Sequence, residues 1–138
     1  MRSFTLIETL AMIVLIALVA SVGAVALAGA SDTADWRESI AIVRSTDADA
    51  RSLARTSGPV TLTLNAEHNT LRLRAGDELV LARRVPVTIH LVDPSSQTPM
   101  DELRYDPAGR SRDAVFVLSA GDRRETLRIA GLTGWASR

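Results

Sequence analysis

The sequence predicts an α+β fold in which one long N-terminal helix packs on small antiparallel β-sheets. Three features of the 138-residue chain lead to this prediction. An uncharged apolar run extends from Thr9 to Ser31, and an apolar stripe at helical spacing follows it as far as Ser57. Beyond Pro59 the pattern changes to the alternation of apolar and polar residues that is typical of strands.

Composition excludes several classes of protein. The 16 basic residues balance 16 acidic ones, which excludes a generally basic nucleic-acid-binding protein. The chain has no cysteine, and this excludes disulfides, thiolate metal sites and a cysteine nucleophile. The stability of the domain therefore has to come from packing.

The apolar run would span about 35 Å as a helix, enough to cross one hydrocarbon core. Arg2 precedes the run, while Asp32 and Asp35 follow it. The positive-inside bias then predicts a single-pass protein with a cytoplasmic N-terminus. The alternative is a cleavable secretory signal ending at the small residues Ala28 and Ala30, which would release a secreted β protein.

Glu8 stands at the start of the apolar run, where a charge is costly unless it has a partner. The string from Phe4 to Leu10, FTLIETL, resembles the type III signal of type IV pilins and pseudopilins. The resemblance implies that a prepilin peptidase cuts between Ser3 and Phe4 and that the new amino group of Phe4 is methylated. It also implies that Glu8 meets the N-terminal charge of a neighbouring subunit during assembly.

Residues 32–57 are expected to form an amphipathic helix that ends at Gly58 and Pro59. Its apolar stripe consists of Trp36, Ile40, Val43, Ala50 and Ala54, widened by Leu53. Other faces are expected to carry Arg37, Arg44, Asp47, Arg51 and Arg55. An i,i+4 pair between Asp47 and Arg51 would contribute only about 0.2–0.5 kcal/mol.

Seven strands are predicted in the remainder of the chain. The first three are expected to form an antiparallel meander, and Pro86 favours an edge position or a strand beginning for the fourth. The predicted strands cover residues 60–64, 70–74, 78–82, 85–92, 103–105, 114–119 and 126–130.

Two later segments extend the resemblance. Residues 103–111, LRYDPAGRS, and residues 127–134, LRIAGLTG, are similar to segments of the GspH/FimT group of minor pseudopilins. The resemblance implies a long helix followed by two small antiparallel sheets. The expected organisation is a short prepilin-type leader over 1–3, a transmembrane helix over 4–31, the amphipathic helix over 32–57 and an antiparallel β domain over 58–138.

The function implied by the resemblance is that of a structural subunit of a type II secretion pseudopilus or a type IV pilus-like filament. Its expected partners are other pseudopilins or pilins, the prepilin peptidase and an inner-membrane assembly platform. The expected location is the inner membrane, with a single span, a cytoplasmic N-terminus and a periplasmic C-terminal domain, before assembly into a periplasmic or surface filament.

No motif predicts catalysis. The two histidines, His68 and His90, are expected in a turn and on a strand face, and no nucleophile-and-base or phosphate-binding motif surrounds the serines or glycines. We therefore expect no enzymatic activity, no metal and no cofactor.

DNA binding is the remaining alternative, because some FimT-like relatives bind DNA through an arginine-rich tail. Of the basic residues in such a tail, this chain retains only Arg138. A Gly-Arg-x-Arg sequence that includes Arg110 and Arg112 occurs in an earlier turn. Asp106 and Asp113 interrupt these cations, and phosphate binding scales with the number of neutralised contacts. A solvated loop of mixed charge is the favoured interpretation of this segment.

Overall fold

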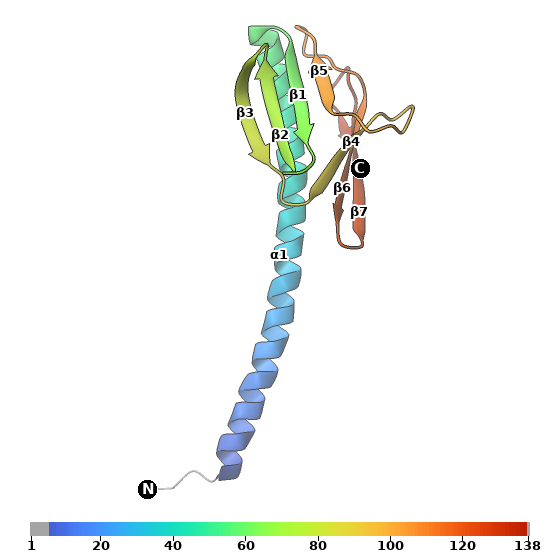
Figure 1. Ribbon diagram of the computed structural model, residues 1–138. Coiled ribbons are helices and arrows are strands. Elements are labelled where there is room, and N and C mark those ends of the chain that lie inside the picture. Colours follow the sequence, from blue (N-terminus) through green and yellow to red (C-terminus); the bar gives the residue numbers. More distant parts are fainter. Residues whose placement is uncertain (1–5, 138) are drawn as a thin grey trace. The chain divides into compact units, whose positions relative to one another are not determined.

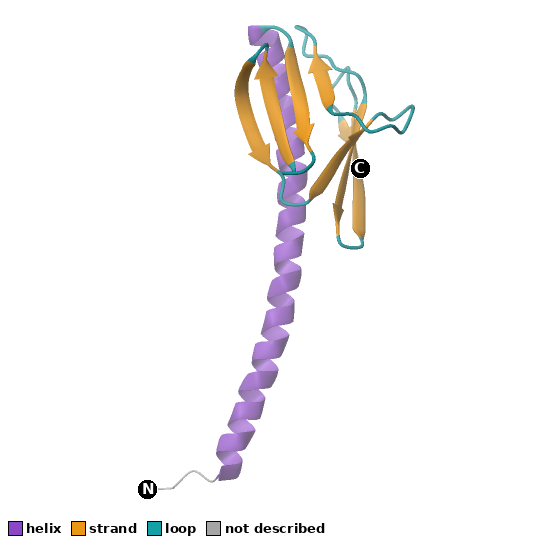
Figure 2. Ribbon diagram, viewed as in Figure 1, coloured by secondary structure: helices purple, strands orange, loops and turns teal. Residues whose placement is uncertain are grey.

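The computed structural model describes residues 6–137, apart from the side chains of residues 22–31. The chain divides into two units, of which the first ends at Ala34 and the second begins at Asp35. The elements within the described residues, drawn in Figures 1 and 2, are α1 (Leu6–Ser57), β1 (Val60–Asn65), β2 (Thr70–Ala75), β3 (Glu78–Arg84), β4 (Thr88–Val92), β5 (Glu102–Tyr105), β6 (Ala114–Ala120), β7 (Arg123–Ile129) and β8 (Ala136–Ser137). The predicted α+β class is confirmed.

Helix α1 ends where the sequence predicts. Gly58 has φ +91°, a left-handed conformation that glycine adopts without steric cost, and its N–H donates to the carbonyl of Ala54 at 3.1 Å. Pro59 follows directly and lacks the N–H that a further helical turn would need. Gly58 and Pro59 therefore end the helix, and they are the only two residues between α1 and β1.

The predicted inner-membrane, single-pass location is wrong. Among the residues that the structure describes, no helix is both long enough and apolar enough to cross a membrane.

The second unit holds two four-stranded antiparallel sheets (Figure 1). Their strand orders are β3-β2-β1-β5 and β4-β6-β7-β8. The first three strands form the predicted meander, and β5 adds to β1 with Leu62 opposite Leu103. Strand β4 lies at an edge of the second sheet, one of the two alternatives predicted from Pro86, and Pro86 itself precedes the strand.

The largest differences from the predicted strands are at β4, β7 and β8, and the other strand limits lie within two residues of the prediction. Strand β4 begins at Thr88, because the N–H of Val85 donates instead to the carbonyl of Asn69 at 2.7 Å. Strand β7 begins earlier, at Arg123, since Gly121 at φ +56° allows a two-residue turn and lengthens the hairpin. Strand β8 has only two residues, too few for any alternation to predict it.

The core of the second unit lies between α1 and the inner faces of both sheets. The predicted helical stripe is confirmed, and Leu53 is partly buried beside it. Alternate strand residues complete the core, the largest fully buried ones being Tyr105, Phe116, Leu62, Leu71, Leu73, Ile89, Leu91, Leu103, Leu118, Leu127 and Ile129. Trp36 also binds the β6–β7 hairpin, since its indole Nε1 donates to the carboxylate of Glu125 and the Arg123 guanidinium lies 4.5 Å from its ring centroid.

Candidate functional site

The predicted processing and tail residues cannot be placed. Ser3, Phe4 and Arg138 lie outside the described residues. Glu8 lies in the first turn of α1 with an exposed side chain, where a carboxylate complements the positive end of the helix dipole. Its assembly role stays a prediction.

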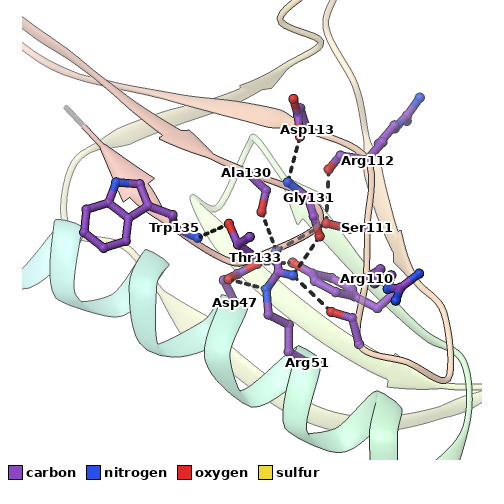
Figure 3. Close-up of polar contacts among 12 residues, drawn as sticks. Asp47, Arg51, Arg110, Ser111, Arg112, Asp113, Ala130, Gly131, Thr133 and Trp135 are labelled. Carbon is purple, nitrogen blue, oxygen red and sulfur yellow. Dashed lines mark hydrogen bonds and ion pairs between the residues drawn. The ribbon is translucent and has the colours of Figure 1, made fainter.

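Arg110 and Arg112 share the loop between β5 and β6, and both side chains are exposed. The Arg112 guanidinium donates to the carbonyl of Glu102 at 3.2 Å and, in Figure 3, points away from Arg51. The acidic neighbours of these arginines accept hydrogen bonds from backbone N–H groups. Asp106 accepts from the N–H of Arg110 at 2.8 Å, and Asp113 accepts from the N–H of Gly131 at 2.7 Å. DNA binding by this loop stays a prediction.

Asp47 and Arg51 are where the sequence prediction fails. They were expected on faces of α1 other than the apolar stripe, but only 4% of Asp47 and 6% of Arg51 is exposed. Asp47 accepts from Nε of Arg51 at 2.8 Å through one carboxylate oxygen and from the Tyr105 hydroxyl at 2.8 Å through the other. The expected weak surface pair is a buried one.

The Arg51 guanidinium connects α1 to two distant loops (Figure 3). Its Nη1 donates to the carbonyls of Gly109 at 3.0 Å and Gly131 at 2.8 Å. Its Nη2 makes longer contacts, at 3.3 Å to the carbonyl of Ala130 and at 3.4 Å to the hydroxyl of Ser111. One side chain thus holds the β5–β6 loop and the segment that follows β7 against the same helix.

Glycines allow these loops to approach. A Cβ on Gly109 would lie 2.9 Å from the backbone oxygen of Arg51, and one on Gly134 would lie 2.8 Å from Nε of Arg51. A Cβ on Gly131 would lie 2.1 Å from the carbonyl oxygen of Ser111. We call Asp47, Arg51, Tyr105 and the loop residues that contact them the Arg51 cluster.

The Arg51 cluster holds Tyr105 in its neutral form. Burial raises the pKa of the Tyr105 hydroxyl well above its usual range. The negative charge of Asp47 and the hydrogen bond it accepts raise that pKa further, and only Arg51 acts in the opposite direction. The hydroxyl therefore serves as a fixed donor to Asp47.

The sequence carried a signal for this burial. The stripe from Trp36 to Ala54 advances in steps of four and three, except for one step of seven from Val43 to Ala50. Asp47 occupies the position that this step omits, so it faces the core with the stripe. A polar residue in that register needs buried partners, and Arg51, one turn later on the helix, supplies the opposite charge.

The Arg51 cluster leaves no buried polar atom unsatisfied in the described part of the chain. Such a network fixes loop geometry, and the surface that it organises is the open groove beside it, lined by Arg44, Arg55, Thr133 and Trp135. His68 lies in the turn between β1 and β2 and His90 lies on β4, and both side chains are exposed. Within residues 6–137 no three acidic or histidine side chains are grouped so that they could hold a metal.

Comparison with protein-family models, with curated proteins and with solved structures finds no match to this chain. The resemblance to the GspH/FimT group therefore rests on the sequence segments themselves.

Replacing Gly109 by alanine should cost more stability than replacing Gly76. Both glycines have positive φ, +74° and +59°, but a Cβ on Gly76 has no atom within 4 Å. We expect Gly76→Ala to lower the free energy of unfolding by about 1 kcal/mol and Gly109→Ala by about 2–4 kcal/mol. Denaturant titration followed by circular dichroism measures both, and equal losses would contradict the close packing of this loop on α1.

Stability should fall at high pH because of Tyr105. An unfolded tyrosine ionises near pH 10, whereas the pKa of folded Tyr105 is raised. Its contribution is therefore complete below about pH 10 and is lost as the pH rises further. Tyr105 is the only tyrosine, so tyrosinate absorbance should appear only with unfolding, and Tyr105→Phe should flatten the pH dependence. A native protein that titrates near pH 10 would contradict the buried placement.

Proposed function

We propose that this chain is a structural subunit of a helical filament, of the kind formed by minor pseudopilins in a type II secretion pseudopilus or a type IV pilus. The observation that carries the proposal is the exposure of large apolar side chains along the first part of α1. They include Leu6 at 87%, Ile7 at 77% and Val19 at 68% exposure.

These side chains surround the helix and do not form one stripe. Val14, Leu15 and Ile16 follow one another and are 52%, 65% and 64% exposed, and successive residues point about 100° apart on a helix. A helix that is apolar on all sides is stable only when neighbours cover it on all sides. A filament that gathers the same helix from several subunits supplies such neighbours, whereas a single docking partner covers one face.

The second unit supports the proposal by having its own core. The helix residues in its buried cluster run from Trp36 to Ala54, and no described residue before Trp36 belongs to that cluster. The exposed apolar residues between Leu6 and Val19 are therefore not needed to complete the β domain, and they are available to other copies or other subunits.

Glu8 would set the register of this packing. A carboxylate placed among apolar helices is costly unless a cation meets it, so one axial position between neighbours is favoured over the others. By the resemblance, the cation is the amino group at Phe4 of the adjacent subunit. The DNA-binding alternative has less support, since Arg112 contacts the carbonyl of Glu102 and two aspartates share the loop.

Glu8→Leu should lower incorporation into filaments by about tenfold, which corresponds to the loss of roughly 1.4 kcal/mol per contact. Glu8→Asp should be intermediate, because the charge stays on a side chain one methylene shorter. The readout is the share of the protein that sediments with sheared filaments and crosslinks to the major subunit.

Glu38→Leu is the matched control, since it removes an exposed glutamate from the same helix in the second unit. It should assemble like the unaltered chain. Normal incorporation of Glu8→Leu would contradict the role of Glu8, and absence of the unaltered chain from every filament fraction would overturn the proposed function itself.

A further inference from the structure

An open groove of about 460 Å³ runs beside the Arg51 cluster, within the second unit. One wall is a face of α1 that carries Arg44, Arg51 and Arg55, and the other is the C-terminal segment with Thr133 and Trp135. Figure 3 shows Trp135 and Arg51 at this junction of helix and segment. Ala48 and Ala136 supply apolar surface between the walls.

The charge of the groove is unbalanced. Asp47 is its only acidic lining residue, and both of its oxygens are occupied by Arg51 and Tyr105. Arg44 is exposed and forms no hydrogen bond or ion pair with any described residue, while Arg55 makes a single contact, from Nε to the carbonyl of Ala108 at 3.3 Å. Two exposed guanidinium groups thus face the groove without a carboxylate to pair with.

The backbone of Trp135 is held by two hydrogen bonds, while its ring is exposed. Its carbonyl accepts from the N–H of Ala130 at 3.0 Å, and its own N–H donates to the hydroxyl of Thr133 at 3.3 Å, yet 74% of the residue is exposed. A large exposed aromatic ring on a held backbone has little conformational entropy to lose on binding. Tryptophan and arginine are also the residue types that most often dominate protein interfaces.

We propose that this groove binds an acidic segment of a partner protein, in which two carboxylates flank an apolar side chain. The carboxylates would pair with Arg44 and Arg55 and the apolar side chain would pack on Trp135. Arg44 and Arg55 are eleven positions apart on α1, which is about 16 Å of axial rise. An extended chain advances about 3.3 Å per residue, so the carboxylates would stand four to six residues apart.

The observations favour a peptide over a nucleic acid. Affinity for nucleic acid grows with the number of phosphates that are neutralised, and only two exposed cations line this groove. Binding of single strands also depends on successive aromatic platforms, whereas Trp135 is the only aromatic lining residue. Guanidinium groups bind carboxylates and phosphates alike through two parallel hydrogen bonds, so the small number of cations and aromatic rings decides in favour of the peptide. This inference does not depend on the filament role.

The test uses the full-length chain, kept in solution with a mild non-ionic detergent. A fluorescein-labelled peptide carrying glutamates five residues apart around a central leucine is titrated by fluorescence anisotropy at low and at physiological salt. We expect micromolar binding that weakens as salt rises, and a peptide with glutamines in place of the glutamates should bind at least about tenfold more weakly.

The double variant Arg44→Ala with Arg55→Ala should lose about tenfold in affinity for the peptide or more. Arg72→Ala with Arg84→Ala is the control of equal charge, because it removes two exposed arginines from β2 and β3, and it should bind like the unaltered chain. Trp135→Ala should weaken binding without changing its salt dependence.

Two results would overturn the proposal. One is an equal loss of binding in the groove and control variants, which would indicate unspecific attraction to charge. The other is tighter binding of a single-stranded oligonucleotide than of the acidic peptide, together with loss of oligonucleotide binding when Arg44 and Arg55 are replaced. That result would assign the groove to nucleic acid.

Discussion

The buried guanidinium of Arg51 is the interaction that positions the β5–β6 loop and the segment after β7 against α1. Removing a charge from water is costly, and the cost is offset only where the geometry is good and every donor finds an acceptor. Here Asp47 supplies the opposite charge, and backbone carbonyls of Gly109 and Gly131 accept the remaining strong hydrogen bonds. These acceptors come from loops far apart in the chain, so one side chain determines where both loops lie.

The Arg51 cluster gives a structural reason for one tyrosine and three glycines in segments 103–111 and 127–134, on which the resemblance to the GspH/FimT group rests. The first contains Tyr105 and Gly109, and the second contains Gly131 and Gly134, and all four meet at Arg51 or Asp47. The glycines permit close approach, while the tyrosine donates to the carboxylate. The segments therefore have a structural role, and the surface they position is the groove that Trp135 and the outer arginines of α1 line.

Periodicity was sufficient to predict the helical stripe and the meander of β1, β2 and β3, because each rests on a local repeat of apolar residues. It was insufficient for Arg51 and Trp135. The burial of Arg51 depends on carbonyls 58 and 80 positions away, which no local pattern contains. The same limit applies to β8, whose two residues are held by their partners in β7. The membrane prediction is contradicted, since no helix among the described residues is both long and apolar enough to cross a membrane.

Hydrogen–deuterium exchange of the full-length chain with Arg51→Lys tests the central role of Arg51 most directly. Lysine keeps the positive charge but lacks the planar guanidinium group, whose several N–H donors can reach more than one carbonyl at once. The account predicts that the amides of Gly109, Ser111 and Gly134, which donate to Asp106, Gly131 and Ala130, exchange much faster, while β1 and β2 keep their protection. Unchanged protection of these loop amides would contradict it, as would an equal loss of protection throughout the domain.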